Sequence, residues 1–74
     1  MSPEKLTMMA NQIGRFFAHL GPERAPEEIA DHLRKFWDPR MRREIIAFVA
    51  SGGEGLDPLA AAAVARLAGE AKVS

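Results

Sequence analysis

Four X-Pro steps divide this chain and limit where helices can begin: Ser2-Pro3, Ala25-Pro26, Asp38-Pro39 and Asp57-Pro58. Proline is tolerated at the first helical position because its missing N–H would have no partner there. Serine and aspartate just before it are good N-caps, since their side-chain oxygens accept hydrogen bonds from free backbone N–H groups. Three of the steps therefore predict helix starts, and Ala25-Pro26 predicts a weaker one.

The apolar residues between these steps recur at helical spacing. They predict helices over about 3–20, 26–37, 39–50 and 58–71, each with one apolar face. In the second helix we expect both Phe36 and Trp37 to face inward with the rest of its stripe. No strand pattern competes, so we predict an all-α fold in one domain, 1–74, a small compact bundle of about four short helices.

Glycines and prolines mark where these helices end. Gly21-Pro22 is expected to end the first helix, and Ser51-Gly52-Gly53 to end the third. Ser51 to Gly55 also looks like a glycine-rich loop, but it lacks the preceding strand and the lysine of a phosphate-binding motif. We interpret it as a helix stop followed by a turn.

The chain has 74 residues and no cysteine. A domain this small buries only about 60% of its unfolded surface, and such domains are usually stabilised by disulfides, metals or a partner. Disulfides and thiolate metal sites are excluded without cysteine. A partner is the remaining route, and the lack of cysteine fits a reducing compartment.

Some apolar residues lie outside the apolar stripes of the predicted helices. Met8 lies beside the stripe of the first helix and Ile46 beside that of the third. One interpretation is a second hydrophobic surface that serves as an interface. The other is that four short helices bury all of these side chains among themselves.

Residues that could carry catalysis are scarce. His19 and His32 lie thirteen positions apart, which is not a metal-ligand pair on one helix face. No nucleophile with a base and no paired carboxylates emerge. No apolar run approaches the roughly 18 residues of a membrane span, and the N-terminus does not look like a signal peptide. We therefore expect a chain that does no chemistry alone.

The stretch HLRKFWDPRMRREII, from His32 to Ile46, concentrates positive charge in a chain of zero formal net charge. Between Arg34 and Arg43 five basic residues stand against one acid, Asp38. One hypothesis is a nucleic-acid-binding module, in which the cations neutralise phosphates and aromatic rings stack on bases. Another is a protein interface, because Trp and Arg dominate binding hot spots. The third is that Trp37 is core and the arginines form a solvated face.

Three motifs in this order resemble one family: MANQIGRFF (Met9 to Phe17), HLRKFWDPRMR (His32 to Arg42) and GGEGLDPLAAAAVARL (Gly52 to Leu67). Together they are similar to the small delta subunit of NAD-dependent formate dehydrogenases that contain molybdenum or tungsten. FWDPRMR is the most specific part. The resemblance covers nearly the whole chain, whereas Gly21 to Glu28 matches nothing fixed.

The resemblance implies a non-catalytic accessory subunit of a soluble cytoplasmic complex that oxidises formate and reduces NAD⁺. The partner would be the large catalytic subunit, which would hold bis-molybdopterin guanine dinucleotide with Mo or W and iron–sulfur clusters. Other subunits would carry FMN and further clusters, and this chain would hold no cofactor or metal itself. An assembly chaperone that leaves the mature enzyme is an alternative.

The three motifs contain candidates for partner contact and candidates for folding, and motif membership alone does not distinguish the two. By the resemblance, the candidate partner-binding residues are Trp37, Arg40, Arg42, Phe17, Asn11 and Gln12. For Asn11, a poor helix former in mid-helix, a contact would explain its presence. We assign the remaining motif residues to caps and turns: Asp38, Pro39, Gly52, Gly53, Asp57 and Pro58.

Overall fold

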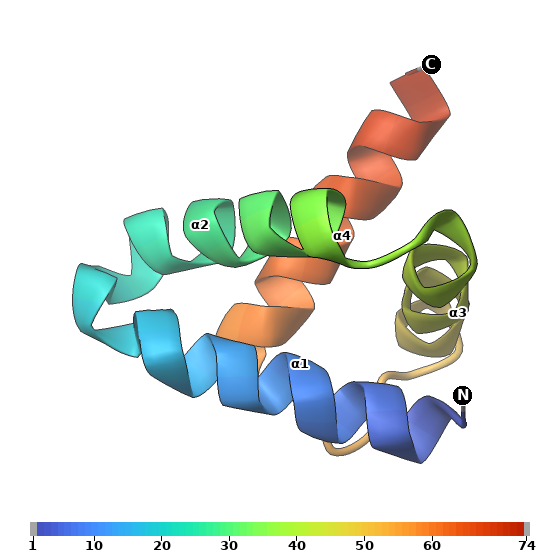
Figure 1. The fold of residues 1–74 in the computed structure, drawn as a ribbon, viewed down its shortest axis with the longest axis horizontal. Coiled ribbons are helices and arrows are strands. Elements are labelled where there is room, and N and C mark those ends of the chain that lie inside the picture. The colour runs from blue at the N-terminus through green and yellow to red at the C-terminus, as the bar shows by residue number, and fades with distance from the viewer. Residues whose placement is uncertain (1, 74) are drawn as a thin grey trace.

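The computed structural model runs through α1 (Pro3–Phe17), the short 3₁₀ helix η1 (Ala18–Leu20), α2 (Gly21–Phe36), α3 (Pro39–Ala50) and α4 (Pro58–Val73) (Figure 1). The structure describes the backbone of residues 2–73 and the side chains of residues 2–70. No strand occurs within this range. The predicted all-α class and small helical bundle are therefore confirmed.

Side-chain caps explain where three of the helices begin. Ser2 and Asp38 each accept a hydrogen bond from the backbone N–H three residues further on, at 3.2 and 2.9 Å. Asp57 Oδ2 accepts from the Leu59 N–H at 3.1 Å, in the first turn of α4. Each cap satisfies a backbone donor that the helix itself leaves without a partner.

The junction between α1 and α2 differs from the prediction. The α-helix ends at Phe17, and α2 already begins at Gly21, so Pro26 lies inside α2 instead of starting it. Gly21 reverses the chain with a φ of 92°, a value that side chains with a Cβ rarely adopt. Pro22 then occupies the start of α2, where proline fits. Pro26 is buried, and its packing offsets the hydrogen bond that its ring removes.

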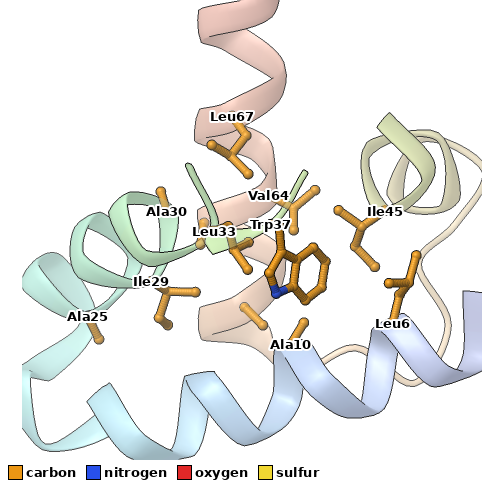
Figure 2. Packing of buried hydrophobic residues seen from close by; sticks show 12 residues of the cluster. Leu6, Ala10, Ala25, Ile29, Ala30, Leu33, Trp37, Ile45, Val64 and Leu67 are labelled. Atoms are coloured by element: carbon orange, nitrogen blue, oxygen red, sulfur yellow. The ribbon is translucent and has the colours of Figure 1, made fainter. Parts of the chain in front are cut away.

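The core lies where α2 and α4 cross, closed by α1 on one side and α3 on another (Figures 1 and 2). Small residues allow this close packing. Ala60 and Ala63 of α4 are fully buried. A Cβ added to Gly14 of α1 would lie 3.6 Å from that of Ala60, which is ordinary contact, and 3.3 Å from Asp57 Oδ2, which would have to shift slightly.

Candidate partner-docking surfaces

Three large apolar side chains are exposed to solvent, although a chain of 74 residues has few apolar side chains with which to build a core. Met8, Phe16 and Phe36 are 63%, 72% and 73% exposed. Isolated exposed apolar residues are common, but clustered aromatic rings indicate a binding surface. Phe16 and Phe36 belong to one such cluster, which spans the exposed edge between α1 and α2. We call it the aromatic surface and define it as Gln12, Ile13, Phe16, Phe17, His32 and Phe36.

Ring contacts connect the aromatic surface from one helix to the other. Phe16 and Phe17 meet edge to face, with ring centroids 5.1 Å apart. Phe17 contacts His32 of α2 at 6.1 Å, and His32 lies 4.7 Å from Phe36. These side chains, except Phe36, line a shallow groove of about 290 Å³. Aromatic rings held in this way present a large apolar area with little conformational entropy to lose on binding.

A second surface lies where α2, α3 and α4 meet. We call it the arginine groove, a space of about 400 Å³ lined by Arg34, Pro39, Arg42, Arg43, Ile46, Leu67 and Glu70. Its apolar members come from α3 and α4, and its cations come from α2 and α3. The arginine groove can therefore hold an apolar side chain close to an anion.

Arg34 clamps α2 to α4 at one end of the arginine groove. Its Nε and Nη2 donate to the two carboxylate oxygens of Glu70 at 2.9 and 2.6 Å, and its Nη1 contacts Asp31 at 3.1 Å. The hydrogen bonds to Glu70 raise the pKa of Arg34. A hydrogen bond from Lys35, together with Arg34, lowers the pKa of Asp31. The charge of Arg34 is thus balanced by carboxylates of this chain.

Trp37 is not on an outer surface, so the expectation that it faces inward is confirmed, and its ring offers little area to a partner although it is among the candidate partner-binding residues. The residue is only 5% exposed, and its indole lies among Leu33, Ile45 and Val64 (Figure 2). Phe36 corrects the other half of that expectation, because it is 73% exposed. Phe36 is the last residue of α2, whereas Trp37 follows as its C-cap in an extended conformation, and the ring of Trp37 enters the core.

Asn11 holds the loop between α3 and α4 against α1. Its Nδ2 donates to the Gly55 carbonyl at 2.9 Å, and its Oδ1 accepts from the Asp57 N–H at 2.7 Å. Both ends of the side-chain amide are thus used within the chain. This internal contact accounts for a mid-helix asparagine without a partner subunit.

The other candidate contact residues fall into two groups. Gln12 and Phe17 lie together on the aromatic surface. Arg42 uses its Nη1 to donate to the Arg34 and Trp37 carbonyls at 2.8 and 2.6 Å, so it caps the end of α2. Arg40 is exposed at the start of α3. A role of these residues in partner binding stays a prediction.

Residues assigned to caps and turns occupy such positions. Asp38 caps α3, and Pro39 is its first residue. Gly52 and Gly53 have φ values of 131° and 59° after the last turn of α3, and the Gly53 N–H donates to the Phe48 carbonyl at 2.9 Å. Pro58 begins α4 directly after Asp57.

The sequence identifies only two of the six residues of the aromatic surface. Phe17 and Gln12 were identified through the resemblance, whereas Phe16, His32 and Phe36 were not. The adjacent aromatics Phe36 and Trp37 gave no signal of this surface, because two neighbouring helical residues can both be buried, as Ile29 and Ala30 are. Which of Phe36 and Trp37 is exposed depends on where α3 and α4 pack.

Metal-binding side chains do not gather in the described part of the chain. Within residues 2–70, no three His, Asp or Glu side chains come close enough to hold a metal ion. The sequence has no cysteine that could bind an iron–sulfur cluster. No helix in the described part is long and apolar enough to span a membrane.

Comparison with known proteins identifies the family. No curated protein and no solved structure matches the chain. The family model described as NADH-dependent formate dehydrogenase delta subunit FdsD matches residues 5–64, which include most of α1, all of α2 and α3, and the start of α4. The resemblance found in the three motifs is thereby confirmed, and this chain belongs to the FdsD family of formate dehydrogenase delta subunits.

Proposed function

We propose that this chain is a non-catalytic accessory subunit that docks on the large molybdenum- or tungsten-containing subunit of a cytoplasmic NAD-dependent formate dehydrogenase. The aromatic surface carries the proposal. Phe16 and Phe36 are both more than 70% exposed in a chain that packs its other aromatic residues more deeply. A member of a subunit family with such a surface is expected to bury it against another subunit.

Docking would stabilise the assembled enzyme by mass action. A partner that binds only the folded form adds RT ln(1 + [L]/Kd) to its stability, about 2.7 kcal/mol at a hundredfold excess over Kd. Both chains gain in this way. In the proposal, the other subunits hold the molybdopterin cofactor, the iron–sulfur clusters, FMN and NAD. For the iron–sulfur clusters this agrees with the lack of cysteine in this chain.

Nucleic-acid binding has less support from the same residues. Trp37 is buried and cannot stack on a base. Arg34 is paired with Glu70 and Asp31, and Arg42 donates to two backbone carbonyls. The positive stretch seen in the sequence is thus partly used within the fold.

The test is an affinity purification of the tagged chain from cells that make its own formate dehydrogenase. The eluate is assayed for formate-dependent NAD⁺ reduction and for bound metal. We expect stoichiometric recovery of the large subunit with activity. Recovery of nucleic acid, or of the chain alone, would contradict the proposal, and binding only to an incomplete enzyme would indicate an assembly chaperone.

A variant pair assigns the contact to the aromatic surface. The double change Phe16→Ser and Phe36→Ser is expected to lower recovery of the large subunit by about tenfold or more, because aromatic anchors are frequent hot spots. Ala62→Ser places the same side chain on an exposed site of α4 and is the matched control. Equal recovery with both variants would exclude the aromatic surface as the contact.

A further inference from the structure

The arginine groove carries positive charge that the described fold does not balance. Arg34 has its own carboxylates, but Arg42 and Arg43 form no ion pair among residues 2–70. Only the Nη1 of Arg42 donates to backbone carbonyls, so its other N–H groups can donate to a ligand. Two guanidinium groups therefore border the groove with donors available to an anion.

Positive charge gathers near the start of α3, whose N-cap is the carboxylate of Asp38. Arg42 and Arg43 lie near the start of α3, and the first turn of this helix contains no acidic residue. Arg40 adds a third cation there. The N-terminus of a helix is the positive end of its dipole and disfavours cations. Arg40 and Glu44 have the spacing of a helical ion pair but form none. Within the described part of the chain, Asp38 is thus the one carboxylate at this helix start, and an external anion would balance more of the positive charge there.

The floor of the groove sets the second property of the ligand. Ile46 and Leu67 line it beside Pro39, and Leu67 is 5% exposed. A volume of about 400 Å³ accommodates a few side chains but no folded element. A matching ligand therefore carries an aliphatic side chain next to a carboxylate.

A protein segment fits this combination better than a nucleic acid does. No aromatic side chain lines the arginine groove for base stacking. A sugar–phosphate backbone has no large apolar group that could pack on the floor of the groove, whereas a leucine or valine side chain could pack there. In an amphipathic helix the charged residues border the apolar face, so one segment can present a carboxylate beside an aliphatic side chain.

We propose that the arginine groove is a second docking site, separate from the aromatic surface, for an acidic amphipathic segment of a partner protein. Its carboxylate pairs with Arg43 and Arg42, and its aliphatic side chain packs on Ile46 and Leu67. The inference rests on the proposed function only in taking the partner from the same complex. It adds a charge-selected contact to an apolar one, which fixes the orientation of the docked subunit.

Site-specific photo-cross-linking tests the inference in cells that make the complete enzyme. A photoreactive amino acid replaces Ile46 in one variant and the exposed Pro39 in another, so that a fault in packing at one site does not decide the result. A third variant carries it at Gln12 of the aromatic surface. Cross-linked peptides are sequenced by mass spectrometry.

Charge reversal supplies the matched pair. Arg43→Glu is expected to reduce the cross-link from the groove by about fivefold or more, since like charges at an interface repel. Arg24→Glu makes the same charge change on an exposed part of α2 outside both surfaces, and it should leave the yield within about twofold. Reversing the captured partner carboxylate to arginine should restore the Arg43→Glu cross-link.

The outcomes separate the two proposals. Capture of a segment with a carboxylate near an aliphatic residue, with charge rescue, supports the groove. Capture from Gln12 but not from either groove position overturns the groove and leaves the proposed function standing. Capture from no position overturns both. Capture of nucleic acid, or equal yields for Arg43→Glu and Arg24→Glu, also overturns the groove.

Discussion

Asn11 and Asp57, 46 positions apart in the sequence, are joined by a 2.7 Å hydrogen bond from the Asp57 N–H to Asn11 Oδ1. The same amide donates to the Gly55 carbonyl, so one side chain of α1 fixes the loop that leads into α4. Asp57 in turn caps the first turn of α4. This chain of contacts places the start of α4 against α1.

We expect Asn11→Ala to lower the free energy of unfolding by about 2 kcal/mol, because it removes two hydrogen bonds of about 1 kcal/mol each. Chemical denaturation of the purified chain measures this. Asn11→Asp keeps the acceptor for the Asp57 N–H but loses the donor to Gly55, so an intermediate loss is expected. A loss as small as that of a neutral surface change would show that the amide does not hold the loop.

Trp37 and Phe36 should respond in opposite ways to truncation. Trp37→Ala is expected to cost about 3–5 kcal/mol and to unfold much of the chain, because it opens a large cavity in the core. Phe36→Ser should change stability by no more than about 0.5 kcal/mol, since its ring is 73% exposed. Thermal melts followed by circular dichroism compare the two. Equal melting temperatures would contradict the burial of the indole.

Thr7 offers a stabilising substitution. It is 8% exposed, and its Oγ1 has no hydrogen-bond partner among the described residues. Thr7→Val keeps the shape and removes the unsatisfied hydroxyl, so we expect a gain of about 1 kcal/mol. Thr7→Ser keeps the hydroxyl and loses the methyl group, and it should destabilise. A Thr7→Val variant less stable than the parent chain would mean that the hydroxyl has a partner in solution.

Asp38 tests the corner between α2 and α3. Its Oδ1 accepts from the Met41 N–H at 2.9 Å. Asp38→Ala should reduce the free energy of unfolding by about 1 kcal/mol through loss of the cap, and Asp38→Ser should recover most of it. Urea denaturation of the three chains gives both values. An unchanged midpoint for Asp38→Ala would show that Pro39 alone sets the helix start.

The lowered pKa of Asp31 predicts how the folding stability of the chain depends on pH in acid. Its pKa is lowered, mainly by the hydrogen bond from Lys35, so the folded state favours the carboxylate. A lowered folded pKa gives stability that is present above the ordinary value of 3.8 and lost as the pH falls through the folded pKa. Melting temperatures from pH 6 down to about 2.5 should therefore fall less steeply for Asp31→Asn than for the parent chain. Parallel curves below about pH 4 would exclude a linked role for Asp31.

Local chemistry allowed much of the fold to be predicted from the sequence. Ser2, Asp38 and Asp57 precede prolines and cap helices with their own side chains, and Gly52-Gly53 ends α3 by adopting positive φ. These interactions join residues that are close in the sequence, so the local sequence is sufficient to predict them. The all-α class and the helix starts at Pro3, Pro39 and Pro58 follow from them.

The tertiary structure alone decided which apolar residues are core and which polar residues meet. Trp37 is buried and Phe36 exposed because α3 and α4 pack on one side of the α2 terminus. Pro26 stays inside α2 because its ring packs in the core, which offsets a lost hydrogen bond. Asn11 reaches Asp57, and Arg34 reaches Glu70, across gaps of 46 and 36 residues. Such contacts depend on how the helices are oriented in space. Helical periodicity identifies the apolar face of each helix, but it does not determine which other helix packs against that face.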